Sequence, residues 1–191
     1  MAFRGTEPTQ WSDIKADLKI RRVKCPTGFV HRGFRDALNE VWDNVSKWLS
    51  AQKKEHVFFT GHSLGGALAT LAASRWNTTT THLYTYGSPR VGGKKFVQSF
   101  KTTERYRYRN NNDIVTRVPF EILGYKHVSG DGGNFIYFDV NGNVSTNFSR
   151  WYMFKQWIKG TLRGFTKLKI DGFSDHSIEA YYNFCRKEWQ K

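Results

Sequence analysis

The sequence predicts an α/β protein with a largely parallel central sheet. Short apolar segments alternate with segments whose apolar residues recur at helical spacing, which is the pattern of strands joined by helical crossovers. One segment, TGHSLGGALA at residues 60–69, joins an apolar strand to a helix rich in small residues. A chain of 191 residues is long enough for one sizeable core, so residues 1–191 are expected to form a single domain.

The first half of the chain predicts three strands and two helices. Residues 1–5 are interpreted as the end of a strand that begins where the chain begins, and residues 34–52 carry apolar side chains at near-helical spacing. The mostly apolar run HVFFT, at residues 56–60, is typical of a buried parallel strand. Residues 65–76 are expected to form a helix of small residues. Residues 82–86 form the next strand, which the breaker GSP ends.

The second half continues the alternation. Residues 94–100 weakly favour a helix, and RYRYR at residues 105–109 alternates in a way that predicts a strand with its arginine face in water. Residues 135–144 are expected to form a hairpin because they contain an Asn-Gly turn. The last two expected helices span residues 150–163 and 174–189.

The segment at residues 60–69 has the arrangement of a nucleophile elbow, a strand followed by G-x-S-x-G and a helix. Ser63 must sit on a turn so sharp that its backbone is strained, and bulky residues two positions away would clash. Gly61 and Gly65 therefore flank it. The following helix points its first N–H groups at the reacting centre, so the N–H of Leu64 is expected to be one oxyanion donor.

A serine nucleophile needs a histidine base downstream of it in this arrangement. Of the three histidines that follow Ser63, His82 opens a strand at the wrong end, and His127 lies in a short expected strand. His176 lies in a loop that leads into the last helix, where an imidazole can reach the edge of the sheet. The base is therefore assigned to His176, and His127 remains the alternative.

The base in turn needs a carboxylate that orients it. Asp113 follows the arginine-rich strand in a polar turn, which is where catalytic residues gather in open α/β sheets. Asp131 is the second candidate on the same logic. Asp175 is adjacent to His176, but neighbouring residues seldom face each other correctly. Asp113 is therefore predicted to be the acid.

With these residues the chain resembles the class 3 lipase family, the fungal-lipase-like branch of the α/β-hydrolases. The matching residues run along the whole chain and occur in the family's order. They are Phe3 to Thr6, Trp11, Asp17-Leu18, Val30 to Phe34, Thr60 to Ala69, Tyr84 to Gly92, Asn110 to Val115, Pro119, Asp175-His176 and Tyr181.

The resemblance implies an α/β-hydrolase fold, a lipid-ester substrate, and catalysis without a metal or cofactor. The family triad carries over onto Ser63, Asp113 and His176, and its second oxyanion donor carries over onto Thr6. The family's lid would correspond to residues 7–13, a segment so short that a small or absent lid is expected. Because the chain begins inside the family's Phe-Arg-Gly-Thr strand, the fold is expected to be abbreviated at its N-terminus.

The charge of the chain points to an acidic partner. The sequence holds 30 Lys and Arg against 16 Asp and Glu, a formal charge of +14. Residues 151–163 carry a basic, aromatic-rich helical pattern that could lie on an anionic membrane or a lipid–water interface, although an apolar face buried in the core is the more ordinary interpretation. Nucleic-acid binding is disfavoured because no recognition motif accompanies the charge.

The expected function is hydrolysis of lipid carboxylic esters, in the manner of a triacylglycerol lipase or a phospholipase A1. The alternative is a catalytically impaired protein of the same fold that binds lipid or a membrane surface. The N-terminus, MAFRGTEPTQ, lacks the long apolar region of a signal peptide, and no apolar run approaches the length of a membrane-spanning helix. A cytoplasmic location is therefore the default expectation, and secretion remains the alternative if the N-terminus is incomplete. Cys25 and Cys185 are expected to be free thiols, and the pattern leaves the oligomeric state undetermined.

Overall fold

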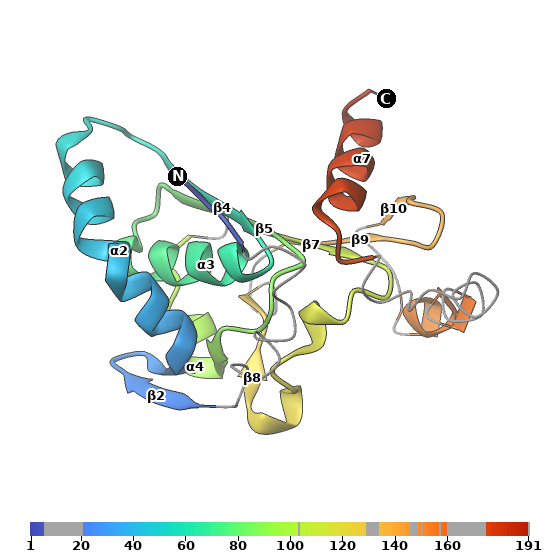
Figure 1. The fold of residues 1–191 in the computed structure, drawn as a ribbon, viewed down its shortest axis with the longest axis horizontal. Coiled ribbons are helices and arrows are strands. Elements are labelled where there is room, and N and C mark those ends of the chain that lie inside the picture. Colours follow the sequence, from blue (N-terminus) through green and yellow to red (C-terminus); the bar gives the residue numbers. More distant parts are fainter. Residues whose placement is uncertain are drawn as a thin grey trace.

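A computed structural model describes residues 1–5, 21–102, 104–128, 134–145, 149, 151–156, 158–159 and 175–190. Within these residues the central sheet has six strands (Figure 1). Their order across the sheet is β1 (Ala2–Phe3), β4 (Val57–His62), β5 (Thr81–Tyr86), β7 (Arg105–Asn110), β9 (Asn134–Phe138) and β10 (Val144–Ser145). Neighbours from β1 to β9 pair in parallel, and β9 and β10 form an antiparallel hairpin. The predicted largely parallel sheet is confirmed.

The helices follow the strands as the spacing predicted. They are α2 (Arg32–Ala51), α3 (Leu64–Trp76), α4 (Lys94–Gln98) and α7 (Ile178–Trp189). Helix α3 packs on β4 and β5 and is covered in turn by α2, while α7 lies beyond β7 and β9 (Figure 1). The last helix begins later than predicted because Ser177 caps it, its Oγ accepting a hydrogen bond from the N–H of Ala180 at 3.1 Å.

The core lies where α2 and α3 meet the sheet. Leu38 of α2, Phe59 of β4 and Ala67 of α3 are each fully buried. Small residues on α3 let its backbone approach the strands closely, and the larger side chains of α2 and β4 fill the remaining space. The carboxyl end of β4, which leads into the elbow, is thereby fixed by packing against α3, which α2 covers.

A second, four-stranded sheet was not predicted. Its order is β2 (Arg22–Cys25), β3 (Gly28–His31), β6 (Gly92–Gly93) and β8 (Tyr125–Lys126), all antiparallel. Strands of two to four residues are too short to produce a periodic signal. His31 is buried in this region between Phe34 and Tyr125, with ring centroids 4.3 and 6.4 Å away, so its imidazole packs among aromatic rings.

Two expectations about exposure are wrong. The arginines of β7 do not face water: Arg105 is 4% exposed, and burial lowers the pKa of Arg107 to about 9. Their guanidinium groups lie over aromatic rings instead, that of Arg107 only 3.8 Å from the ring centroid of Phe135 on the adjacent strand. Stacking of this kind lets a planar cation replace an apolar residue on a covered face.

The apolar side of the helix at residues 151–159 is also not in the core, contrary to the more ordinary interpretation of its pattern. Trp151 is 62% exposed, Phe154 45% and Ile158 38%. The residues expected to continue this helix, from 160 onward, lie outside the described residues. The exposure of its apolar stripe is therefore a property of the first two turns.

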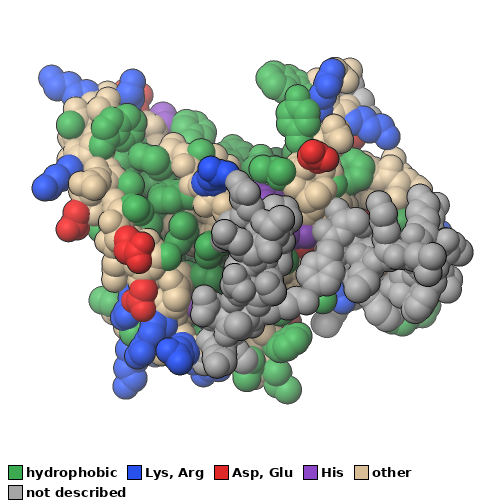
Figure 2. All heavy atoms as spheres, in the orientation of Figure 1, with side chains coloured by type: hydrophobic (Ala, Val, Ile, Leu, Met, Phe, Trp, Pro, Cys, Tyr) green, Lys and Arg blue, Asp and Glu red, His purple; other side chains and the backbone are tan. Residues whose placement is uncertain are grey.

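Basic side chains are spread over several edges of the face drawn in Figure 2 rather than gathered in one place. Within the part of the chain that the structure describes, no helix is both long and apolar enough to cross a membrane. Cys25 and Cys185 are both free, as predicted. Two short 3₁₀ helices, η2 (Val115–Arg117) and η3 (Glu121–Leu123), follow β7 and complete the described elements.

Candidate active site

Ser63 occupies the sharp turn between β4 and α3. Its backbone has φ 57° and ψ −126°, a conformation that is strained for a residue with a side chain. The turn is held by a hydrogen bond of 2.9 Å from the N–H of Ser63 to the carbonyl of Tyr86 on β5. Ser63 is 1% exposed, and its Oγ makes no hydrogen bond to any described residue. The elbow geometry that the motif predicted is present.

The two flanking glycines are required by backbone packing. A Cβ at Gly61 would lie 2.3 Å from the carbonyl oxygen of Gly65, across the turn. A Cβ at Gly65 would lie 2.2 Å from the carbonyl oxygen of Phe3 in β1. Both distances are far below van der Waals contact, and the atoms concerned are backbone, so neither neighbour can move aside cheaply. The elbow therefore locks β1, β4 and α3 together.

The N-terminus of α3 points at the elbow. The carbonyl of Ser63 accepts hydrogen bonds from the N–H groups of Gly66 and Ala67, at 3.0 and 3.3 Å. Leu64 is the first residue of the helix, where N–H groups have no partner within the helix. Its N–H therefore belongs to the end of the helix that attracts negative charge.

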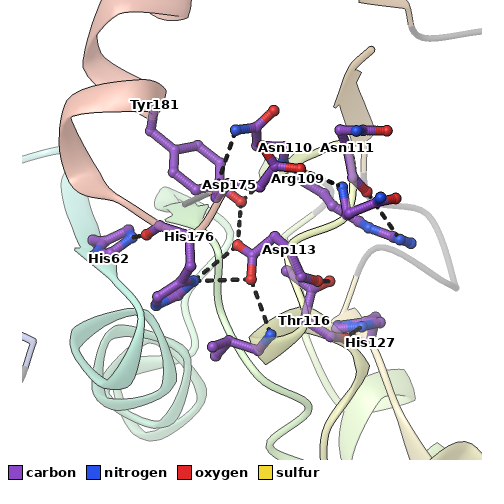
Figure 3. A network of polar contacts seen from close by, with 12 residues as sticks. His62, Arg109, Asn110, Asn111, Asp113, Thr116, His127, Asp175, His176 and Tyr181 are labelled. Atoms are coloured by element: carbon purple, nitrogen blue, oxygen red, sulfur yellow. Dashed lines mark hydrogen bonds and ion pairs between the residues drawn. The ribbon is translucent and has the colours of Figure 1, made fainter. Parts of the chain in front are cut away.

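Asp113 and His176 are joined by hydrogen bonds. The Nδ1 atom of His176 lies 2.9 Å from both carboxylate oxygens of Asp113, and the two residues are 4% and 0% exposed (Figure 3). The carboxylate also accepts a hydrogen bond from the N–H of Val115 at 2.9 Å and one from the hydroxyl of Tyr181 at 2.6 Å. Nδ1 is thereby committed to Asp113, which leaves Nε2 as the atom of this ring that can accept a proton.

The backbone of Tyr86 and Gly87, at the end of β5, lies between the serine and the Asp113–His176 pair. Ser63 bonds to the carbonyl of Tyr86, and a Cβ at the next residue, Gly87, would lie 3.0 Å from the imidazole of His176 and 2.7 Å from Asp113. Gly87 has φ +57°, so both its conformation and its surroundings require glycine. The structure thus brings the predicted nucleophile, acid and base together around the end of β5.

Tyr181 and Asp175 tie α7 and the loop before it to the end of β7. The hydroxyl of Tyr181 accepts a hydrogen bond from the N–H of Asn110 at 2.9 Å, and burial together with the Asp113 carboxylate holds the pKa of Tyr181 well above its usual range. Asp175 turns its carboxylate to the N–H of Asn112 at 2.9 Å, and its carbonyl accepts from the side chain of Asn110 at 2.9 Å. Asp175 therefore supports the backbone of the site (Figure 3).

His62 supports His176 from the elbow side. Its Nε2 lies 2.8 Å from the carbonyl oxygen of His176, so this nitrogen carries a proton and donates. The two imidazole rings are stacked, with centroids 4.6 Å apart and planes 30° apart. Burial is the main cause that lowers the pKa of His62 to about 4, and the charge of His176 adds to it. His62 is therefore neutral at pH 7, and it packs against His176 and donates a hydrogen bond to its carbonyl.

The low pKa of His62 predicts acid sensitivity. Between pH 6.5 and 4 the unfolded chain binds more protons at this residue than the folded chain, so the free energy of unfolding falls as the pH falls. The free energy of unfolding of the wild type falls between pH 7 and pH 4.5. We expect the substitution His62→Gln, which keeps an N–H donor, to make this fall smaller by about 2–3 kcal/mol. Urea denaturation of both proteins at the two pH values measures it. Parallel pH profiles of the two proteins would contradict the prediction.

The remaining candidates lie elsewhere or outside the described residues. Nε2 of His127 lies 2.7 Å from the carbonyl oxygen of Thr116, and burial with the charges of Arg107 and Arg90 holds the pKa of His127 well below its ordinary value. Since the carbonyl can only accept, Nε2 of His127 is the donor. His82 pairs with His56, 2.8 Å away, near the start of β4 and β5. Thr6, Asp131 and the lid segment at residues 7–13 lie outside the described residues.

Sequence reasoning assigned no role to Tyr181, although its carboxylate contact is among the shortest hydrogen bonds of the site. The available signal was its position five residues after His176, in the first turns of a helix whose start faces the site. Tyr181 is 2% exposed in the structure, and a buried hydroxyl needs a hydrogen-bond partner.

Comparison with known proteins places this site in a family. The family model for lipase (class 3) matches residues 1–123. The secreted mono- and diacylglycerol lipase 1 of Fusarium solani is 43% identical over 116 residues, which is 54% of this chain and 35% of that protein. The chain thus spans about a third to a half of the length of the first curated relatives that it matches, apart from one bacterial toxin of which it spans 15%.

Solved structures give the same result. The triacylglyceride lipase of Rhizomucor miehei superposes with a TM-score of 0.64 and 30% identity, over 76% of this chain and 60% of that one. A triacylglycerol lipase whose catalytic centre is described as a serine protease triad superposes with a TM-score of 0.58 and 30% identity, over 70% of this chain and 55% of that one. The shared sheet is that of the α/β-hydrolase fold. On the family model and this shared fold, the chain belongs to the class 3 lipase family.

Proposed function

We propose that residues 1–191 act as one α/β-hydrolase domain that hydrolyses carboxylic esters of lipids through an acyl-enzyme on Ser63. The observation that carries the proposal is the convergence of three elements: a strained serine at the N-terminus of α3, a buried imidazole, and a carboxylate bonded to the Nδ1 of that imidazole. This combination activates a hydroxyl that is otherwise a weak nucleophile. The relatives named as lipases support the same reaction class.

In the proposed reaction, Ser63 Oγ attacks the ester carbonyl while Nε2 of His176 takes its proton. Asp113 holds the ring in the tautomer with its proton on Nδ1, so that Nε2 can accept the serine proton, and it stabilises the imidazolium that forms. The N–H of Leu64 donates to the tetrahedral oxyanion, and the resemblance assigns the second donor to Thr6. His176 then gives the proton to the departing alcohol. Water, deprotonated by the same imidazole, releases the fatty acid and restores Ser63.

The substrate is proposed to be an acylglycerol, because the relatives are named as lipases of mono-, di- and triacylglycerols. The charge of +14 favours substrate presented in an anionic phospholipid surface, and the sn-1 ester of a phospholipid is the alternative substrate. Rates on diacylglycerol and on phosphatidylglycerol in the same mixed vesicles separate the two. Three relatives are named as secreted enzymes, which supports an extracellular site of action.

Reaction with a fluorophosphonate tests the proposal directly. An activated serine is expected to form one covalent adduct, which peptide mass spectrometry locates at Ser63, and the heat-denatured chain is expected to give none. A folded chain that stays unlabelled at pH 8 would favour the second candidate, a lipid-binding protein of the same fold without catalysis. An adduct at another serine would reject Ser63 as the nucleophile while leaving a serine hydrolase in place.

A further inference from the structure

The helix at residues 151–159 is turned with its polar side toward the protein. The hydroxyl of Tyr152 donates to the Asp139 carboxylate at 3.1 Å, in the turn between β9 and β10. Gln156, one helical turn later on the same side, is only 6% exposed. The apolar side faces outward, with Trp151, Phe154 and Ile158 exposed by 62, 45 and 38%. This is the reverse of the usual arrangement, in which the apolar stripe of a surface helix faces the core.

The outward side is built as one surface. Its three apolar residues are spaced by three and four, so they lie along a single stripe. The rings of Trp151 and Phe154 are stacked with centroids 5.5 Å apart, and the ammonium of Lys155 lies 5.5 Å from the Trp151 ring centroid. Lys159 is exposed one turn further along. We call Trp151, Phe154, Lys155, Ile158 and Lys159 the basic aromatic face.

We propose that the basic aromatic face seats the enzyme on anionic phospholipid surfaces. Tryptophan and phenylalanine beside lysines are the composition of helices that lie in the plane of a membrane interface, with rings among the acyl chains and ammonium groups at the phosphates. The inference rests on the proposed function, since an enzyme that hydrolyses lipid esters has to stay on the surface that presents them.

The charge of the molecule selects this partner over a second copy of the chain. Each copy carries a formal charge of +14, and two of its lysines lie on the face itself, so two copies meeting there would repel. An aliphatic residue in the stripe adds nothing to binding of a phosphate backbone, which makes nucleic acid a poorer match. An anionic lipid surface satisfies the aromatic rings, Ile158 and the lysines together.

A matched pair of variants tests the proposal. The first is Trp151→Ala/Lys155→Glu, in the face. The control is Trp48→Ala/Lys47→Glu on α2, where Trp48 is 55% exposed beside an exposed lysine. Co-sedimentation with vesicles of 30% phosphatidylserine in phosphatidylcholine is measured for each, with pure phosphatidylcholine vesicles as the uncharged comparison. Hydrolysis of a water-soluble short-chain p-nitrophenyl ester is followed in parallel.

We expect the wild type to bind the anionic vesicles more tightly than the uncharged ones, the face variant to bind them about 30-fold or more weakly, and the control to bind like the wild type. Equal losses in the two variants, or none in the face variant, would overturn the proposal. A wild type that is a dimer in analytical ultracentrifugation, together with a face variant that is a monomer, would also overturn it, because the face would then join two copies. An inactive wild type on the soluble ester would reject the proposed reaction while the vesicle result still reports on the face.

Discussion

Replacement of Ser63 by alanine is expected to lower kcat for lipid-ester hydrolysis by about 10⁵-fold or more. The variant keeps the backbone of the elbow but lacks the oxygen that forms the acyl-enzyme. Water attacking directly would have to use the same imidazole without a covalent intermediate. The residual rate then reports what the oxyanion donors and substrate positioning supply alone. Initial rates on emulsified diacylglycerol measure the effect.

The matched control is Ser88→Ala. Ser88 is also buried, at 3% exposure, and its hydroxyl donates to the carbonyl of Pro89 in its own turn at 3.1 Å. Loss of that hydrogen bond costs about 1 kcal/mol of stability and is expected to leave kcat within a few-fold of the wild type. If the alanine at position 63 keeps activity while folding normally by circular dichroism, Ser63 is not the nucleophile.

Replacement of Asp113 by asparagine is expected to lower kcat by about 10⁴-fold, the second largest effect. The carboxylate accepts from His176, Tyr181 and the N–H of Val115, and a neutral amide cannot accept from all three. An amide NH₂ turned toward the imidazole would favour the tautomer with its proton on Nε2, which cannot receive the serine proton. The pH profile of kcat/KM on a soluble ester measures both the loss of activity and any shift in the apparent pKa of the proposed base.

Asp175→Asn distinguishes the two nearby carboxylates. Asp175 bonds to the backbone at Asn112, a contact that an asparagine oxygen can still make. We expect a loss of about tenfold or less, from small displacement of the loop. A larger loss in the Asp175 variant than in the Asp113 variant would reassign the orienting acid to Asp175.

Chain order and local pattern were sufficient for the sheet and for the elbow. The strand–turn–helix signal around Ser63 depends on residues next to one another in the sequence, and a Cβ at Gly61 or Gly65 would meet backbone of the same turn or of β1 and the two residues after it. The structure joins Asp113 and His176 by hydrogen bonds, as the chain order led us to expect. Their catalytic roles, with those of Leu64 and Thr6, remain predictions.

What sequence reasoning missed depends on contacts between distant residues. Tyr181 reaches Asp113 only because α7 docks beyond β7, and His62 contacts the carbonyl of His176 across 114 residues of chain. The arginines of β7 were expected in water because charge alone cannot show that aromatic rings, Phe100 and two rings of β9, will lie against them. The helix at residues 151–159 was misjudged for a similar reason: its pattern gives two faces but does not say which one the protein takes.

Because α7 and the turn before it carry two partners of Asp113, assembly of the site depends on the equilibrium between docked and detached α7. The first turn of this helix carries Tyr181, and the turn before the helix carries His176. Both side chains that bond to the Asp113 carboxylate therefore leave together whenever α7 detaches, and only the N–H of Val115 among its described partners remains. Detachment of one helix disrupts fewer contacts than unfolding of the central sheet, so it costs less free energy. The fraction of molecules in which the proposed triad is assembled therefore depends on how often this helix is docked, and amide hydrogen exchange along α7 measures that fraction without any substrate.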